Sequence, residues 1–213
     1  MQPGSTPPWS IPHGGDFAAA RDLLLFDDMT HAHVELPAGL VPPEGKTIEL
    51  VYPATEMVLR EIIKLREQCS SITPGGASLL KPLEPSELWA LLPTTLTAWQ
   101  DDALVGTAYW QSLGDRPDTA MIGGIAVDEQ SRRNGICPQM VARLLQECRE
   151  EGILWAISIT AHPGLQRYYA NNSWQKAEAG SPWQAQLNIS RARYAQTGEA
   201  HLPELYVFDL DAA

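Results

Sequence analysis

The chain has 213 residues, 44% hydrophobic and 19% charged, which allows one main domain with a substantial core. A formal net charge of −11 argues against a broad phosphate-binding surface, and so against non-specific nucleic-acid binding as the main function. Three cysteines in no zinc-binding pattern, no export signal and no long apolar run together predict a cytoplasmic protein without a membrane span.

Residues 1–45 have proline and glycine gathered in their opening and closing stretches, and we expect them to be an N-terminal extension of unknown role. Within this extension, His31, His33 and Glu35 would share one face of an extended segment, as the ligands of an open metal site do. Short His-x-His stretches are also common on plain surfaces and no fourth ligand is apparent, so no metal site is predicted.

From residue 46 to residue 213 the pattern is that of a mixed α/β domain. The spacing of apolar residues and of turn residues predicts the following elements, in chain order: a strand at 47–52, a helix from 55 to 66, a helix at 85–92, a hairpin of strands at 95–99 and 104–110, a strand at 120–127, a helix with Pro138 in its first turn that ends at Gly152, a strand at 154–161, a helix at 164–172, and strands at 174–179 and 204–210. Residues 180–203, between the last two strands, are expected to be irregular.

Two adjacent glycines, Gly123 and Gly124, interrupt the strand at 120–127. Glycine weakens the interior of a strand, and it is placed there mostly where a bulge or a close approach of another backbone is needed. The pair therefore predicts a β-bulge and gives a first indication of a ligand nearby.

The segment RRNGICP, at 132–138, connects this strand to the clearest helix of the chain. A strand that passes through a glycine turn into a helix leaves backbone N–H groups unpaired at the positive end of the helix dipole, which is an arrangement that binds phosphate. Gly135 permits close approach of the backbone, and Arg132 and Arg133 add charge. Taken alone, the segment is equally consistent with a plain helix start followed by a solvated arginine pair.

The order of these features resembles the GNAT superfamily of N-acetyltransferases. The family signature runs from a valine through a short turn to Arg/Gln-x-x-Gly-x-Gly/Ala at a helix start, and this chain has Val127, Arg132, Gly135 and Cys137 at those places. The family also carries a tyrosine followed four and five residues later by Gly-Phe, and here Tyr169 precedes Ser173-Trp174 by the same intervals. The resemblance covers residues 46–179 and does not cover the extension.

This resemblance implies a splayed, mostly antiparallel mixed sheet flanked by helices, with acetyl-CoA as acyl donor in the opening between two strands. The pantetheine arm is expected along the strand that ends at Val127, and the pyrophosphate at the glycine turn; two asparagines that follow the second helix are weaker candidates. The implied donor-binding residues are Ile125, Ala126, Val127, Arg132, Arg133, Asn134, Gly135, Ile136, Cys137, Asn171 and Asn172.

The resemblance also implies the catalytic groups of direct acetyl transfer to a primary amine. Tyr169 corresponds to the general acid of the family; the alternative is a core tyrosine with a satisfied hydroxyl. No Asp, Glu or His lies between Thr119 and Val127 to act as base. A water relay is therefore expected, and His162 is the residue predicted to contact that water or the acceptor; the alternative is a loop histidine without a role.

The acceptor and the partners are less defined. The acidic balance of the chain favours a small cationic amine or a basic peptide as acceptor. The extension would cover the acceptor pocket, pack on the domain or bridge two subunits of a homodimer. A non-catalytic CoA-binding sensor or interaction module is the alternative function, and an unrelated nucleotide-binding protein is less supported because both GxxxxGK[ST] and GxGxxG are absent.

Overall fold

A computed structural model describes residues 47–52, 54–70, 80, 83–195 and 202–212 of the chain. Within these residues the backbone forms a seven-stranded sheet in the order β1-β2-β3-β4-β5-β7-β6. All neighbours pair antiparallel except β4 and β5, which are parallel, so the predicted mostly antiparallel mixed sheet is confirmed. The strands are β1 (Glu49–Val51), β2 (Thr95–Gln100), β3 (Ala103–Leu113), β4 (Arg116–Val127), β5 (Trp155–Thr160), β6 (Gln175–Lys176) and β7 (Glu204–Asp209).

The hairpin between β2 and β3 turns at Asp101 and Asp102, which both have positive φ, at 50° and 62°. Two central residues in the left-handed region give the turn type whose twist matches that of the flanking strands, and aspartate tolerates this backbone better than most residues. The predicted hairpin is therefore confirmed. β4 begins at Arg116, four residues before the predicted start, because Gly114 and Asp115 alone complete the preceding turn.

The bulge predicted from Gly123 and Gly124 is present in β4. Tyr109 pairs with Gly123, while Thr107 pairs with Ala126, so β4 contains one residue more than β3 between these pairs. Gly124 has φ +63°, and a Cβ built on it would lie 2.3 Å from Cε1 of Tyr109. Only glycine fits this position without a shift of its surroundings.

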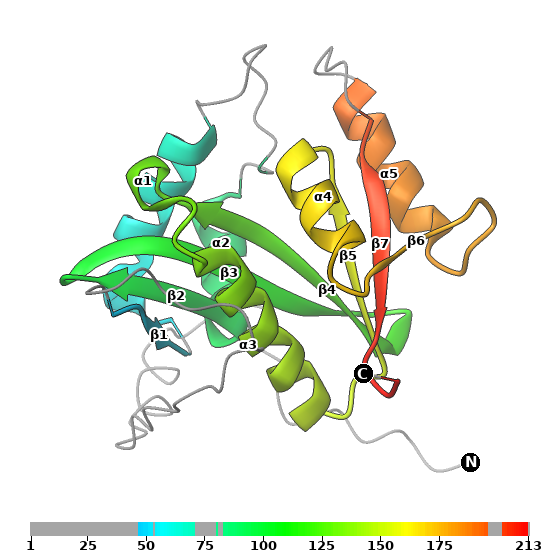
Figure 1. Cartoon of the computed structure of the whole chain (residues 1–213), viewed down its shortest axis with the longest axis horizontal. Coiled ribbons are helices and arrows are strands. Elements are labelled where there is room, and N and C mark those ends of the chain that lie inside the picture. Colours follow the sequence, from blue (N-terminus) through cyan, green and yellow to red (C-terminus); the bar gives the residue numbers. More distant parts are fainter. Residues whose placement is uncertain (1–46, 53, 71–79, 81–82, 196–201, 213) are drawn as a thin grey trace. The chain divides into compact units, whose positions relative to one another are not determined.

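The sheet opens between β4 and β5. The two strands pair only at Thr119 with Trp155, Ala120 with Ala156, and Met121 with Ile157. β4 continues for six more residues, to Val127, and β5 for three more, to Thr160, without pairing to each other. The expected splay is thus confirmed, and Figure 1 shows β4 and β5 diverging. The apex of the opening is the last pair, Met121 with Ile157.

Helices cover both faces of the sheet. On one face, α3 packs on a core that includes Ala156 of β5 and Tyr169 of α4. On the other face, Leu187 of α5 packs with Ile157 of β5, and Figure 1 shows α3 in front of the sheet and α5 behind β7. The helices are α1 (Leu59–Ser70), α2 (Pro85–Leu91), α3 (Ile136–Glu150), α4 (Pro163–Ala170) and α5 (Gln184–Ala195), with 3₁₀ turns η1 (Glu56–Val58), η2 (Leu92–Thr94) and η3 (Glu129–Ser131).

The helix predicted around Pro138 is α3, and both of its ends are as expected. Pro138 lies in the first turn, where the missing N–H costs no helical hydrogen bond. At the other end, Gly152 adopts φ +74°, its N–H donates to Arg149, and the N–H of Ile153 donates to Cys148. This is the Schellman arrangement that terminates many helices at a glycine. One side of α3 is buried throughout, through Ile136, Met140, Val141, Leu144, Leu145 and Cys148.

Two predictions about the C-terminal third were wrong. The segment 180–203 is not irregular throughout, because Gln184–Ala195 form α5. Its helical pattern is weak, since Leu187 is buried whereas Ile189 is 64% exposed. Packing of Trp183 and Leu187 on the sheet stabilises the helix more than its own sequence does. The strand expected at 174–179 is reduced to Gln175–Lys176.

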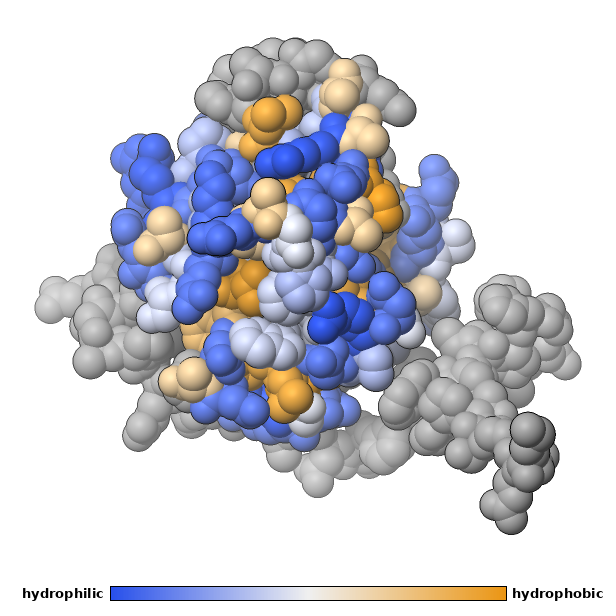
Figure 2. Space-filling model, turned by 90° about the vertical axis from the view of Figure 1, so that its right-hand side faces the viewer, coloured by the Kyte–Doolittle hydropathy of each residue, from blue (hydrophilic) through white to orange (hydrophobic). Residues whose placement is uncertain are grey.

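The expected extension at 1–45 lies outside the described residues, and so do His31, His33 and Glu35. In the described part of the chain, no helix is long and apolar enough to cross a membrane. The face shown in Figure 2 is mostly hydrophilic, with hydrophobic residues in small groups separated by polar ones. The homodimer stays a prediction.

Candidate functional site

The loop between β4 and α3 is shaped by side-chain caps and left-handed backbone. The carboxylate of Asp128 accepts hydrogen bonds from the N–H groups of Gln130, at 3.0 Å, and Ser131, at 3.2 Å, which fixes η3 directly after the strand. Arg133 and Gly135 then adopt φ 68° and 75°. Left-handed residues between right-handed ones turn successive N–H groups toward a common side, and such a concave row of donors binds anions.

Several backbone donors of this loop are left available. The first N–H of α3 to bond back along the helix is that of Gln139, which donates to Gly135 at 3.2 Å. Among the described residues, the N–H groups of 133–137 have no hydrogen-bond acceptor, and Pro138 has no N–H. These donors lie at the positive end of a helix of 15 residues. The geometry therefore fits the predicted phosphate loop.

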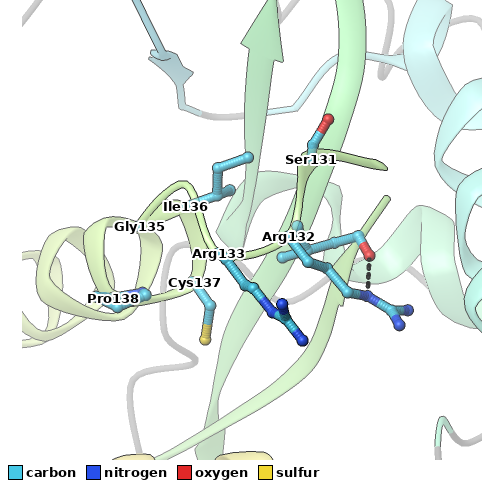
Figure 3. A pocket seen from close by; sticks show the side chains of 8 residues that line it. Ser131, Arg132, Arg133, Gly135, Ile136, Cys137 and Pro138 are labelled. Carbon is cyan, nitrogen blue, oxygen red and sulfur yellow. Dashed lines mark hydrogen bonds between the residues drawn. The ribbon is translucent and has the colours of Figure 1, made fainter. Parts of the chain in front are cut away.

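A pocket of about 310 Å³ lies against this loop (Figure 3). Figure 3 shows the side chains of Arg132 and Arg133 projecting to the same side of the backbone as the sulfur of Cys137. Arg132 is also tied to the strand, since its Nε donates to the carbonyl of Val127 at 3.1 Å. The lining residues are Val127, Ser131, Arg132, Arg133, Gly135, Ile136, Cys137 and Pro138.

Cys137 occupies the place where the family signature has glycine or alanine. Its side chain is half-buried and packs against the core beneath α3, and burial raises the pKa of its thiol to about 12. The group is therefore an uncharged thiol at neutral pH. It adds no negative charge next to the phosphate loop, so it does not oppose an anion there.

The strand segment Ile125–Val127 lies along the opening of the sheet. Ala126 pairs with Thr107 of β3, so its backbone belongs to the ladder on the closed side of β4. The carbonyl of Val127 accepts hydrogen bonds from Nε of Arg132 and from Sγ of Cys69, the latter at 3.4 Å. The structure thus places the predicted strand residues and the predicted loop residues next to each other, joined through Arg132.

Tyr169 lies near the apex of the opening and is completely buried, with 0% of its surface exposed. Its hydroxyl donates to Oγ of Ser158 at 2.9 Å. Ser158 is the first residue of β5 beyond the last pair with β4. Burial raises the pKa of the Tyr169 phenol well above its usual value, and the group stays protonated at physiological pH. It can therefore donate a proton, but any acyl group that it serves must reach it through the opening.

The neighbouring Tyr168 faces a different environment. It is half-buried, its ring meets that of Tyr169 edge-on at a centroid distance of 5.4 Å, and it packs against the same core as Cys137. Burial raises its pKa as well, with a further contribution from Cys137. Consecutive helical residues point about 100° apart, which separates the two hydroxyls.

His162 is the N-cap residue of α4. Its Nδ1 accepts hydrogen bonds from the N–H groups of Gly164, at 3.1 Å, and Leu165, at 3.4 Å. Partial desolvation lowers its pKa, and the positive charges of Arg132 and Arg167 lower it further. The neutral ring therefore accepts at Nδ1 and carries its proton on Nε2. In that state Nε2 can donate a hydrogen bond to a ligand but cannot accept a proton from it.

Asn171 and Asn172 lie at the opposite end of α4 from His162. Both are exposed, Asn171 is the C-cap residue, and Nδ2 of Asn172 donates to the carbonyl of Tyr168 at 2.6 Å. Neither asparagine lines the pocket at the phosphate loop. Their part in donor binding stays a prediction.

The structure adds two residues that motif spacing did not indicate. Ser158 reaches Tyr169 only through the fold, because the two lie eleven positions apart in the chain and in different elements. Arg66 lies in α1, is only 6% exposed, and donates from Nη1 to the carbonyl of Gly124 at 3.2 Å. An arginine within the apolar stripe of a helix was the available signal for Arg66, because a charge is rarely buried without a partner.

The search for metal ligands covers the part of the chain that the structure describes. No group of three or more His, Cys, Asp or Glu side chains there is arranged to hold a metal ion. The described site therefore consists of backbone donors, two arginines and a buried hydroxyl pair.

The sequence also matches a known protein family. The model of the acetyltransferase (GNAT) family matches residues 61–172, which is more than half of the chain and includes the bulge, the loop and α4. The chain belongs to the GNAT acetyltransferase family. By this membership it is an acetyltransferase.

Solved structures of GNAT proteins share this fold at low sequence identity. N-acetylglutamate synthase from Neisseria gonorrhoeae is 17% identical with a TM-score of 0.62, over 77% of this chain and 35% of that one. A GNAT acetyltransferase from Staphylococcus aureus is 15% identical with a TM-score of 0.59, over 77% and 99% of the two chains. Diaminobutyrate acetyltransferase from Paenibacillus lautus is 16% identical with a TM-score of 0.57, over 78% and 96%. No curated protein matches the sequence.

Proposed function

We propose that the chain transfers an acetyl group from acetyl-CoA to a primary amine by direct attack of the amine on the thioester. The observation that carries this proposal is the joining of two features in one place. A loop whose N–H groups have no acceptor among the described residues lies at the end of β4, and the sheet opens beside that same strand. A long donor with a diphosphate in its middle and a thioester at its end requires both.

The donor would bind along β4 and α3. Backbone N–H groups from Arg133 to Cys137 would hold the pyrophosphate, with charge from Arg132 and Arg133, and Asn134 lies within the same turn. The pantetheine arm would follow the segment Ile125–Val127, and Asn171 and Asn172 are the weaker candidates for a contact to the donor. The chain itself thus supplies backbone donors and two cations.

Tyr169 is proposed as the general acid, with Ser158 as its partner. In the reaction the amine nitrogen forms a bond to the carbonyl carbon, the carbon–sulfur bond breaks, the nitrogen loses a proton, and the sulfur gains one. The Tyr169 hydroxyl can supply that proton directly or through Ser158, to which it is already hydrogen-bonded. A water molecule would take the proton of the amine and pass it on through further water to solvent. His162 would orient that water or the acceptor by a hydrogen bond from Nε2.

The acceptor is proposed to be a small amine or a basic peptide. The net charge of −11 supports a cationic molecule. Two structural neighbours support a small molecule: one is described in complex with coenzyme A and N-acetyl-glutamate, and another with 2,4-diaminobutyric acid and coenzyme A.

The test of this function is the release of thiol from acetyl-CoA in the presence of a panel of small amines and basic peptides. Release that depends on one class of acceptor, with the acetylated product found by mass spectrometry, is the expected result. Titration calorimetry with CoA runs beside it. Tight CoA binding without thiol release from any acceptor would contradict the proposal.

That second outcome would favour a non-catalytic CoA-binding sensor. One observation points in that direction, namely that the Tyr169 hydroxyl is fully buried and already has a hydrogen-bond acceptor. A tyrosine of this kind can serve the core alone. Replacement of Tyr169 by phenylalanine distinguishes the two functions, because only the enzyme loses turnover.

A further inference from the structure

Residues 124–127 of β4, which we call the donor limb, have a neighbouring strand on one side only. They lie beyond the last pair of β4 with β5, so β3 alone is beside them. Within the bulge, Gly124 and Ile125 have no partner in β3 either. The course of the donor limb therefore depends on contacts from outside the sheet, and two of these come from α1.

Arg66 of α1 contacts the first residue of the donor limb. Its Nη1 donates to the carbonyl of Gly124 at 3.2 Å, and only 6% of its surface is exposed. A Cβ built on Gly124 would lie 2.7 Å from this Nη1, so the guanidinium packs directly on the bulge. A carbonyl that a bulge leaves outside the ladder needs another donor, and a charged donor makes a stronger hydrogen bond than a neutral one. Arg66 thus fixes the direction of the Gly124 carbonyl.

Cys69 contacts the last residue of the donor limb. It lies three positions after Arg66, which puts both side chains on one face of α1. Its Sγ donates to the carbonyl of Val127 at 3.4 Å. Burial raises the pKa of the Cys69 thiol, against the opposing charge of Arg132, so the S–H group is present at neutral pH and can donate. Nε of Arg132 donates to the same carbonyl, and Val127 therefore connects α1 to the loop before α3.

The groups proposed for the acetyl transfer belong to other elements. Tyr169 lies in α4 and Ser158 in β5, whereas α1 packs on β3, β4 and α2. A change at the contacts between α1 and the donor limb should therefore alter how the donor binds, and should leave the proton transfer at Tyr169 in place.

We infer that α1 positions the donor-binding strand, with Arg66 and Cys69 holding the two ends of the donor limb on the course that the pantetheine arm follows. Both are positioning residues, because each acts through a backbone carbonyl of β4. The inference rests on the proposed donor site. It adds a support that comes from 58 positions earlier in the chain.

The first experiment replaces Arg66 by methionine, which keeps an apolar stem and removes the donor. Titration calorimetry with CoA and thiol-release kinetics are measured for the original protein and the variant. Arg66→Met should raise the Kd of CoA and the KM of acetyl-CoA about tenfold, as loss of a charged hydrogen bond predicts, with kcat within about twofold. Arg66→Lys keeps a cation and should bind CoA more tightly than Arg66→Met. A lower kcat with an unchanged Kd and KM would overturn the inference.

The second experiment compares two replacements of Cys69. Cys69→Ala removes the donor and should raise the Kd of CoA about threefold, as loss of a neutral hydrogen bond predicts. Cys69→Ser keeps a donor of similar size and should bind CoA as the original protein does. Equal binding by Cys69→Ala and Cys69→Ser would overturn the role of this residue. This pair also decides the inference if Arg66→Met does not fold.

Ile62→Val is the control for a general loosening of α1. Ile62 is fully buried in the same helix, where it packs with Leu88 and Leu92 on the side of α2. Its replacement should lower the melting temperature, through loss of a buried methyl group, and leave the Kd of CoA unchanged. If Ile62→Val weakens CoA binding as much as Arg66→Met does at a similar loss of melting temperature, the inference is refuted.

The outcomes separate this inference from the function beneath it. If the original protein binds CoA and releases thiol, and the Arg66 and Cys69 variants bind CoA equally well, the proposed function stands and the positioning role is refuted. If the original protein does not bind CoA, both are refuted.

Discussion

The hydroxyl of Tyr169 donates a hydrogen bond to Ser158 at the point where β5 separates from β4. The two side chains come from different elements, and both are buried. Their position at the apex of the opening is where a donor lying between the strands would end. The hydrogen bond therefore connects the core of the domain to the place where we expect the acetyl group to be transferred.

Tyr169→Phe should lower kcat at saturating acetyl-CoA by about a hundredfold or more, the usual contribution of a general acid. It should leave the KM for acetyl-CoA within about twofold of its original value, because the phosphate loop is untouched. Stopped-time thiol-release assays measure both constants. Tyr168→Phe is the matched control and should retain turnover; unchanged turnover in Tyr169→Phe would refute the assignment of the acid.

Gly124→Ala should destabilise the domain strongly. The alanine would be held at φ +63° and its Cβ would lie 2.3 Å from the Tyr109 ring, so we expect a loss of about 3 kcal/mol or more in the free energy of unfolding. Chemical denaturation followed by circular dichroism measures this loss.

Two other glycines serve as controls for Gly124. Gly152 has φ +74° but open space around a built Cβ, so Gly152→Ala should cost only the backbone strain, about 1 kcal/mol. Gly114 has open space and no positive φ, so Gly114→Ala should have little effect. Equal costs at all three positions would show that the close packing at the bulge is not what requires glycine.

His162→Ala should lower the free energy of unfolding by about 1 kcal/mol, through loss of the N-cap of α4. His162→Asn should restore most of it, because the asparagine side chain also accepts from N–H groups at a helix start. If His162 in addition donates to a ligand from Nε2, His162→Asn should recover stability without recovering turnover. Full recovery of both would limit the residue to capping.

The same cap predicts a dependence of stability on pH. The folded-state pKa of His162 is lowered, so the folded protein prefers the neutral ring. This contribution is complete above the unfolded-state pKa of about 6.5 and is lost as pH falls through the lower folded-state value. Denaturation at pH 7.5 and at successively lower pH should show a decline in the original protein that is absent from His162→Asn.

Arg133→Ala should weaken CoA binding by about fivefold to tenfold at low salt, the contribution of one cation close to a phosphate. The difference between variant and original should shrink as ionic strength rises, because exposed charges are screened. Calorimetric titration at two salt concentrations measures both effects. Arg60→Ala, an exposed arginine of α1, is the control and should bind CoA as the original does.

The sequence predicted the elements whose signals are local. Asp101-Asp102 indicated the hairpin, Gly123-Gly124 the bulge, and Pro138 with Gly152 the two ends of α3, because each of these depends on backbone preferences within a few residues. The phosphate loop is local in the same sense. Its residues are consecutive in the chain, so motif spacing was sufficient to propose it.

What the sequence did not predict depends on contacts between distant segments. The helix α5 has little apolar periodicity of its own and is held by Trp183 and Leu187 on the sheet. The pairing of Ser158 with Tyr169, and of Arg66 with Gly124, joins residues from separate elements. No spacing rule relates such residues, because their distance is set by the tertiary structure alone.

The three residue pairs between β4 and β5 are the only ladder that connects the two halves of the described sheet. A donor that lay in the opening would contact both halves. It would then hold them together in addition to being a reactant. A ligand that binds only the folded state at a hundred times its Kd adds about 2.7 kcal/mol to the free energy of unfolding. The stability of the folded chain would then rise with the concentration of acyl donor, so that the protein resists unfolding best when its donor is bound.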